Sequence, residues 1–104
     1  SASVKQVANS IGYVEYAYAK QNKLSYALIQ NADGQFPVPD DVSFQAAAAN
    51  ANWSEQPGFG ISLNNQKGAQ AWPITAATFL LVHAKPDKPE QVQAALKFVD
   101  WAFQ

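Results

Sequence analysis

The stretch ITAATFLLV, residues 74–82, is the longest apolar run in the chain and decides the expected fold. Its side chains are nearly all apolar or small, without a clean alternation between apolar and polar residues. A strand with water on one face alternates with a period of two, whereas a strand covered on both faces does not. Residues 74–82 are therefore predicted to form a strand inside a mixed or parallel sheet. The run is far shorter than the ~20 residues that span a bilayer.

The clearest amphipathic helix is predicted directly after this strand. Pro89 and Glu90 are typical of a first helical turn, where the proline nitrogen needs no partner and an acid faces the positive end of the helix. Apolar residues then recur at helical spacing, at Val92, Ala95, Leu96, Val99, Ala102 and Phe103. This stripe needs cover from another part of the protein.

A second helix is predicted after the Asp-Gly turn at residue 33. Pro39 can serve as its first residue, with Asp40 and Asp41 in the positive first turn. The helix should run through four alanines to about residue 51. Its N-terminus accounts for this adjacent pair of carboxylates, so we favour an electrostatic role for them over a metal site.

The stretch SIGYVEYAYAKQNKLSY, residues 10–26, holds all four tyrosines of the chain. Residues 11–16 alternate as a short strand does, residues 15–22 are good helix formers with Asn22 as a stop, and residues 24–30 alternate again. A helix fragment is predicted before this stretch. The tyrosines are thus mainly structural. Strands and helices alternate along the chain, so the expected class is α/β.

Composition excludes several functions. The chain is 48% hydrophobic and only 14% charged, and eight acids against seven bases give a net charge of -1. No basic stripe is present, so nucleic acid is not an expected partner. There is no cysteine, which excludes disulfides, thiol catalysis and cysteine metal sites. The low charge indicates a surface that is neutral-polar or covered by a partner.

No catalytic constellation is recognisable. His83 is the single histidine and has no nearby nucleophile motif or second histidine, so a solvated residue is the better interpretation. Residues 52–70 are glycine-rich but lack the phosphate-loop pattern, and we expect a long irregular connection. Trp101 is expected in the core, whereas Trp53 and Trp72 flank the connection and are ambiguous. We expect no enzyme activity, metal or cofactor.

Residues 9–34 (NSIGYVEYAYAKQNKLSYALIQNADG) and 65–103 (NQKGAQAWPITAATFLLVHAKPDKPEQVQAALKFVDWAF) closely resemble the carboxy-terminal third of bacterial phosphate-binding proteins. These are periplasmic components of the phosphate ABC transporter. The resemblance implies the carboxy-terminal part of a two-lobe, type II periplasmic binding protein fold, with phosphate in the cleft between the lobes. Residues 1–71 would end the second lobe and form the crossover loop. Residues 72–104 would be the return strand and helix of the first lobe.

The same resemblance implies the partners. These are inorganic phosphate, an inner-membrane ABC permease, and an upstream portion of the protein or another copy that covers the apolar faces. The family holds phosphate with helix N-termini, hydroxyls, an arginine and an aspartate. This sequence contains no arginine, so those ligands are expected upstream. Gly12 and Tyr13 are the candidates for an approach to the cleft, because strand ends face it in open α/β sheets.

Two other functions stay open at this point. One is a phosphate-scavenging enzyme or phosphatase relative on the same two-lobe fold, which would need a nucleophile or metal cluster upstream. The other is an interaction module with a surface around Trp53 and Trp72. In either case, a chain that is part of a larger unit should expose bulky apolar side chains. We expect exposure among Phe79, Leu81, Val92, Leu96 and Phe103.

Overall fold

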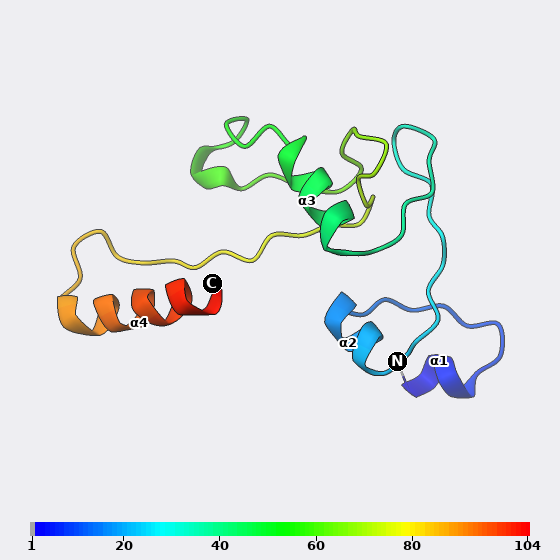
Figure 1. The fold of residues 1–104 in the computed structure, drawn as a ribbon, viewed down its shortest axis with the longest axis horizontal. Coiled ribbons are helices and arrows are strands. Elements are labelled where there is room, and N and C mark those ends of the chain that lie inside the picture. Colours follow the sequence, from blue (N-terminus) through cyan, green and yellow to red (C-terminus); the bar gives the residue numbers. More distant parts are fainter. Residues whose placement is uncertain (1) are drawn as a thin grey trace.

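The computed structural model describes residues 2–104, which form four α-helices and one 3₁₀ helix (Figure 1). The helices are α1 (Ala2–Gln6), α2 (Tyr16–Gln21), α3 (Asp41–Ala49), η1 (Pro57–Phe59) and α4 (Pro89–Ala102). Each predicted helix is thereby confirmed. No helix of this part of the chain is both long and apolar enough to cross a membrane.

Local signals explain where α2 begins and ends. The Glu15 carboxylate accepts hydrogen bonds from the backbone N–H groups of Ala17 and Tyr18, at 3.0 and 3.1 Å. It thereby supplies acceptors for N–H groups of the first turn, which have no carbonyl partner within the helix. Asn22 ends the helix, as predicted, and its side-chain amide donates to the Tyr18 carbonyl at 2.9 Å.

The start of α3 corrects one expectation. Pro39 is not the first helical residue, because the helix begins at Asp41 and Asp40 is its N-cap. The Asp40 carboxylate accepts from the Ser43 N–H at 2.8 Å, and the Ser43 hydroxyl accepts from the Asp40 N–H at 3.0 Å. This reciprocal pair is a capping box. By contrast, Pro89 is the first residue of α4, as predicted.

The three predicted strands are not formed, which corrects the expectation of visible α/β structure in this chain. Residues 11–16, 24–30 and 74–82 belong to no strand, apart from the start of α2 at Tyr16. No backbone-to-backbone hydrogen bond reaches residues 74–82 in the described part of the chain. A strand exists only through the ladder it shares with a neighbour, and none of the described segments supplies one. Sheet formation therefore requires partners from outside these residues.

The chain is far more open than a folded domain of its length. Its radius of gyration is 17.5 Å, whereas about 13 Å is usual for this number of residues. Its accessible surface is 8716 Å², against roughly 5,700 Å² for a folded monomer of this mass. Figure 1 shows residues 74–88 and α4 leading away from the rest of the molecule. As expected, Phe79, Leu81, Leu96 and Phe103 are exposed, whereas Val92 is half-buried.

One region is packed, and it surrounds α3. Its buried apolar residues are Pro39, Ala47, Leu63, Ala71, Trp72 and Pro73. They come from α3 and from the connection that follows it, so residues 31–73 form a small core. The connection at 52–70 was expected to be irregular, and it is, but it lies folded against α3 rather than free in solvent (Figure 1). We call residues 31–73 the α3 unit.

Candidate functional site

The α3 unit is held together by the buried side chain of Asn31. Its amide nitrogen lies within hydrogen-bond distance of the carbonyls of Gly68, Ala69 and Ala71, at 3.0, 2.9 and 3.2 Å. Its amide oxygen accepts from the N–H groups of Asp33 and Gln35, at 3.1 and 2.9 Å. One side chain thus closes the turn at 31–35 and fastens it to the loop at 68–71. Because a buried amide is costly unless it is paired, this complete set of partners defines one geometry.

Further hydrogen bonds tie the connection to α3. The Trp72 N–H donates to the Ser43 carbonyl at 3.1 Å, and the Trp53 indole N–H donates to the Ala48 carbonyl at 2.8 Å. Trp72 is buried and Trp53 is half-buried. The two tryptophans that the sequence left ambiguous therefore anchor the connection. The alternative of an interaction surface built on these two rings receives no support from their placement.

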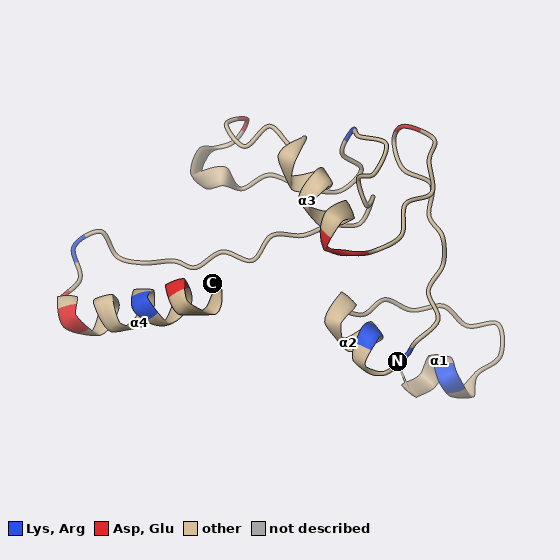
Figure 2. Ribbon diagram, viewed as in Figure 1, with Lys and Arg blue, Asp and Glu red and all other residues tan. Residues whose placement is uncertain are grey.

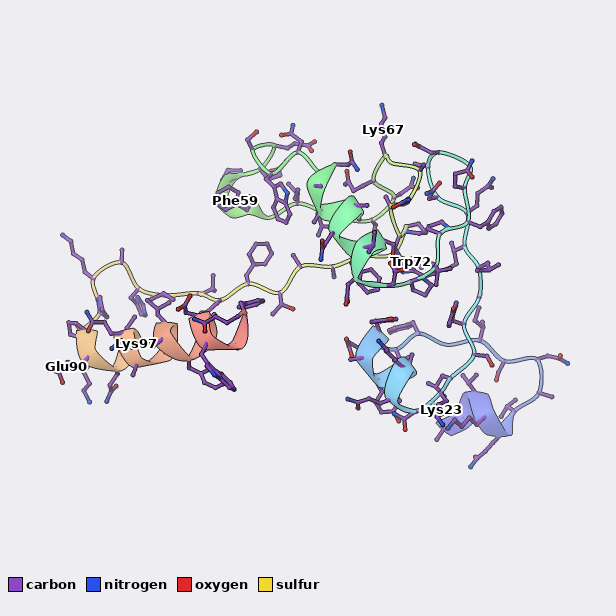
Figure 3. The ribbon with its side chains drawn as sticks, viewed as in Figure 1. Lys23, Phe59, Lys67, Trp72, Glu90 and Lys97 are labelled. Atoms are coloured by element: carbon purple, nitrogen blue, oxygen red, sulfur yellow. The ribbon has the colours of Figure 1, made fainter. Side chains whose placement is uncertain are left out.

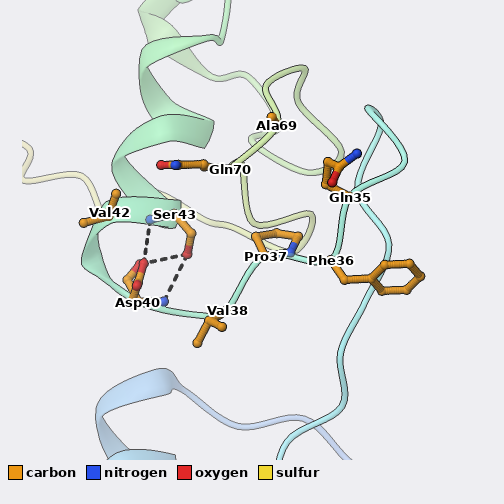
Figure 4. A pocket seen from close by; sticks show the side chains of 9 residues that line it. All are labelled: Gln35, Phe36, Pro37, Val38, Asp40, Val42, Ser43, Ala69 and Gln70. Atoms are coloured by element: carbon orange, nitrogen blue, oxygen red, sulfur yellow. Dashed lines mark hydrogen bonds between the residues drawn. The ribbon is translucent and has the colours of Figure 1, made fainter.

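A hollow of about 430 Å³ lies beside the start of α3 (Figure 4). It is lined by Gln35, Phe36, Pro37, Val38, Asp40, Val42, Ser43, Ala69 and Gln70. Its most polar wall is the Asp40–Ser43 capping box, whose polar groups bind each other. An anion entering there would meet the Asp40 carboxylate, which repels it. This hollow is therefore unsuited to phosphate.

Acidic side chains stand at the starts of three helices. Glu15 caps α2, Asp40 caps α3 with Asp41 in the next position, and Glu90 lies in the first turn of α4. Figure 2 shows the acids at the beginnings of α3 and α4. A helix N-terminus binds an anion through free N–H groups and its positive end. At α2 the Glu15 carboxylate already binds the N–H groups of Ala17 and Tyr18, and at α3 the Asp40 carboxylate binds that of Ser43.

The two candidates for the cleft, Gly12 and Tyr13, lie in the segment between α1 and α2. The Tyr13 side chain is 99% exposed. Gly12 lies close to α1, where an added Cβ would stand 3.1 Å from the Val4 side chain. Neither the hollow beside the start of α3 nor a second one lined by residues of the 52–66 segment includes these two residues. Their approach to a phosphate cleft stays a prediction.

The remaining candidates also stand apart from one another. His83 is exposed, and residues 2–104 contain no group of three or more His, Cys, Asp or Glu side chains placed to hold a metal ion. Trp101 was expected in the core but is 68% exposed, because none of residues 2–104 covers its side of α4. The sequence interpretation missed Asn31. Its position before an Asp-Gly turn was the available signal, since asparagine side chains commonly bind the turn backbone.

The deciding observation comes from similarity to other proteins. The chain is 52% identical over all 104 residues to the phosphate-binding protein PstS of Pasteurella multocida, and it covers 30% of that protein. It is 52% identical over 100 residues to PstS of Haemophilus influenzae, again covering 30% of the relative. Similarity extends to PstS of Methanocaldococcus jannaschii, at 32% over 110 residues. The chain is homologous to a portion of PstS.

The resemblance stated from residues 9–34 and 65–103 is therefore confirmed. The chain spans about 30% of the length of the PstS proteins that it matches. No family model matches it. These relatives are named phosphate-binding proteins, and the expectation of no catalysis stays a prediction for this chain. The phosphatase alternative gains no support from them.

Proposed function

We propose that this chain is the carboxy-terminal portion of a periplasmic protein that binds inorganic phosphate and delivers it to an inner-membrane ABC permease. The observation that carries the proposal is the match of the whole chain to PstS at 52% identity. A likeness this high over 104 residues extends through every helix of the structure. The open shape and the exposed apolar side chains fit a portion of a larger two-lobe protein.

The phosphate ligands themselves are proposed to lie in the rest of that protein. The chain has no arginine, and the starts of α2 and α3 are occupied by carboxylates. What this portion would contribute is the frame of the second lobe and one edge of the cleft. Gly12 and Tyr13 are the proposed residues at that edge, since they lie in an exposed segment before α2.

A division between two lobes near residue 72 also has support. Packing around α3 continues to Trp72 and Pro73, and the last bonds into the α3 unit are those of Thr75. After Thr75 the chain forms no helix until α4, and α4 packs against no other helix of residues 2–104. We propose that residues 1–71 belong to the second lobe and that residues 72–104 return to the first, with residues 72–75 at the crossing still bonded to the α3 unit.

The test uses a grafted protein, in which this chain replaces the matching 30% of the Pasteurella relative. Isothermal calorimetry should show that the grafted protein binds inorganic phosphate and discriminates against sulfate. The isolated 104 residues should give no heat above dilution. A folded grafted protein that ignores phosphate would overturn the proposal. Micromolar or tighter binding by the isolated chain would show that the ligands lie within it, where Gly12 and Tyr13 are the first residues to replace.

A further inference from the structure

Asp33 is the only aspartate of the chain that is followed by a glycine. Both residues are exposed and lie in the turn at 31–35. Because glycine has no Cβ, the Gly34 backbone nitrogen is the least shielded of the nitrogens that follow an aspartate. An aspartyl-glycine pair in an exposed turn is therefore open to attack by this nitrogen on the neighbouring side-chain carboxyl.

The reaction at this pair is an internal condensation that needs no second reactant. The Gly34 nitrogen forms a bond to the Asp33 carboxyl carbon, the bond from that carbon to its hydroxyl breaks, and the hydroxyl leaves with the amide proton as water. Water then opens the five-membered imide at one of its two carbonyls. Opening at the backbone carbonyl leaves isoaspartate, in which the main chain passes through the side-chain methylene. The composition is unchanged overall, but the backbone is one carbon longer.

In the folded structure, both reacting groups are hydrogen-bonded to other partners. The Gly34 N–H donates to the Asn31 carbonyl at 3.0 Å, and the Asp33 carboxylate accepts from the Gly68 N–H at 3.2 Å. Figure 3 shows the loop that carries Lys67, the residue before Gly68, beside this turn. The nitrogen and the carboxyl are held separately, so the attack requires the turn to open.

Asn31 holds that turn closed. Its amide oxygen accepts from the N–H groups of Asp33 and Gln35, and its backbone N–H donates to the Gln35 carbonyl at 2.8 Å. Its amide nitrogen binds the carbonyls of the loop at 68–71. These bonds determine how often the Gly34 nitrogen and the Asp33 carboxyl are free to meet, because a group held by the fold reacts only during local opening.

We propose that Asp33 is a site of spontaneous modification to isoaspartate, and that the hydrogen bonds of Asn31 keep its rate low. The inserted backbone carbon lies between Asp33 and Gly34, inside the turn that Asn31 closes. It shifts the Gly34 N–H relative to the Asn31 carbonyl, so the modified turn no longer fits the bonds that hold the parent turn. Phosphate plays no part in this reaction, so a grafted protein that folds without binding phosphate leaves the modification site unaffected.

Peptide mapping by mass spectrometry in the grafted protein tests the modification. The protein is incubated at mildly acidic pH, because the hydroxyl leaves from the protonated carboxyl, and the aspartyl and isoaspartyl peptides are separated by chromatography before fragmentation. Asp87 is the internal reference, since it is exposed, lies outside any helix and is followed by lysine. Rates at Asp33 and Asp87 are measured in the folded protein and in guanidinium chloride, which removes the fold.

In guanidinium chloride, Asp33 should isomerise at least about tenfold faster than Asp87, because glycine leaves the attacking nitrogen unshielded. Folding should slow the reaction at Asp33 at least about tenfold, and Asn31→Ala should raise the folded rate at least about fivefold, since the turn then opens more often. Gln30→Ala is the matched control, because it removes a single exposed bond to the Gly34 carbonyl. That variant should stay within about twofold of the parent rate.

Equal rates at Asp33 and Asp87 in guanidinium chloride would overturn the modification site. Equal Asp33 rates in the folded and unfolded parent, or in Asn31→Ala and Gln30→Ala, would overturn the role of Asn31. Should Asn31→Ala fail to fold, amide hydrogen exchange at Gly34 in the parent decides instead. Protection of the Gly34 N–H should match the slowing at Asp33, and an unprotected N–H beside a slow reaction would refute control by the turn.

Discussion

The side-chain amide of Asn31 donates to the backbone carbonyl of Ala71 at 3.2 Å, across forty residues of sequence. The two residues are 5% and 0% exposed, so water does not compete for the bond. The same amide reaches the carbonyls of Gly68 and Ala69. This contact joins the turn before α3 to the end of the connection after it.

Replacing Asn31 with alanine should destabilise the grafted protein by about 2–3 kcal/mol, since buried carbonyls and N–H groups lose their partners. The free energy of unfolding, measured by denaturant titration, provides the check. Gln30→Ala is the matched control, because the Gln30 amide makes a single exposed bond to the Gly34 carbonyl. That variant should lie within about 0.5 kcal/mol of the parent. Equal effects of the two substitutions would contradict a stabilising role for the hydrogen bonds of the Asn31 side chain.

Replacing Asp40 with alanine should cost about 1 kcal/mol, because the α3 N-cap is lost. Amide hydrogen exchange should report faster exchange at Ser43, whose N–H donates to the Asp40 carboxylate. Asp41→Ala is the control, since Asp41 lies in the first turn without being the N-cap. Asp40→Asn keeps an acceptor oxygen and should retain most of the protection. Unchanged exchange at Ser43 in Asp40→Ala would refute the capping box.

Replacing Gly68 with alanine should destabilise the α3 unit by about 1–3 kcal/mol, because its backbone is in a conformation that side chains disfavour. The φ angle of Gly68 is +126°, and an added Cβ would stand 2.7 Å from the Asn50 amide nitrogen. The Gly60→Ala variant serves as control in the same connection, where the Cβ would make an ordinary 3.7 Å contact. Thermal melting of the two grafted variants should rank Gly68→Ala clearly lower. The reverse order would be inconsistent with this geometry.

The isolated 104 residues should bind a hydrophobic dye or self-associate, because many bulky apolar side chains have no cover. Leu81 and Phe103 are 91% and 88% exposed, and leaving such a side chain in water forfeits roughly 1.5–3 kcal/mol. Dye fluorescence should fall to the background level in the grafted protein. A monomer that melts cooperatively without binding dye would show instead that the chain covers these side chains by itself.

Features that depend on residues close together in the sequence could be predicted from it, whereas features that depend on distant residues could not. The helices were predictable because their bonds join residues four apart and their ends are marked by nearby side chains. Asn22 and Pro89 stop or start helices where the sequence places them. Homology was equally readable, since it rests on residue order alone. The start of α3 at Asp41, capped by Asp40, rather than at Pro39 is a shift of two positions at a helix end.

Tertiary structure decided everything that depends on distant residues. In the sequence Asn31 is an ordinary turn residue. Its role is seen only in the structure, where the loop at 68–71 lies beside it and its carbonyls accept from the Asn31 amide. Trp72 is buried and Trp101 is exposed, although both stand in apolar surroundings in the sequence. Residues 74–82 have the composition of an inner strand but form none here, because a strand exists only with a partner. The sequence alone determines which segments are helical and which protein the chain resembles. The burial of its apolar side chains and the pairing of its strands depend on the segments that pack against them.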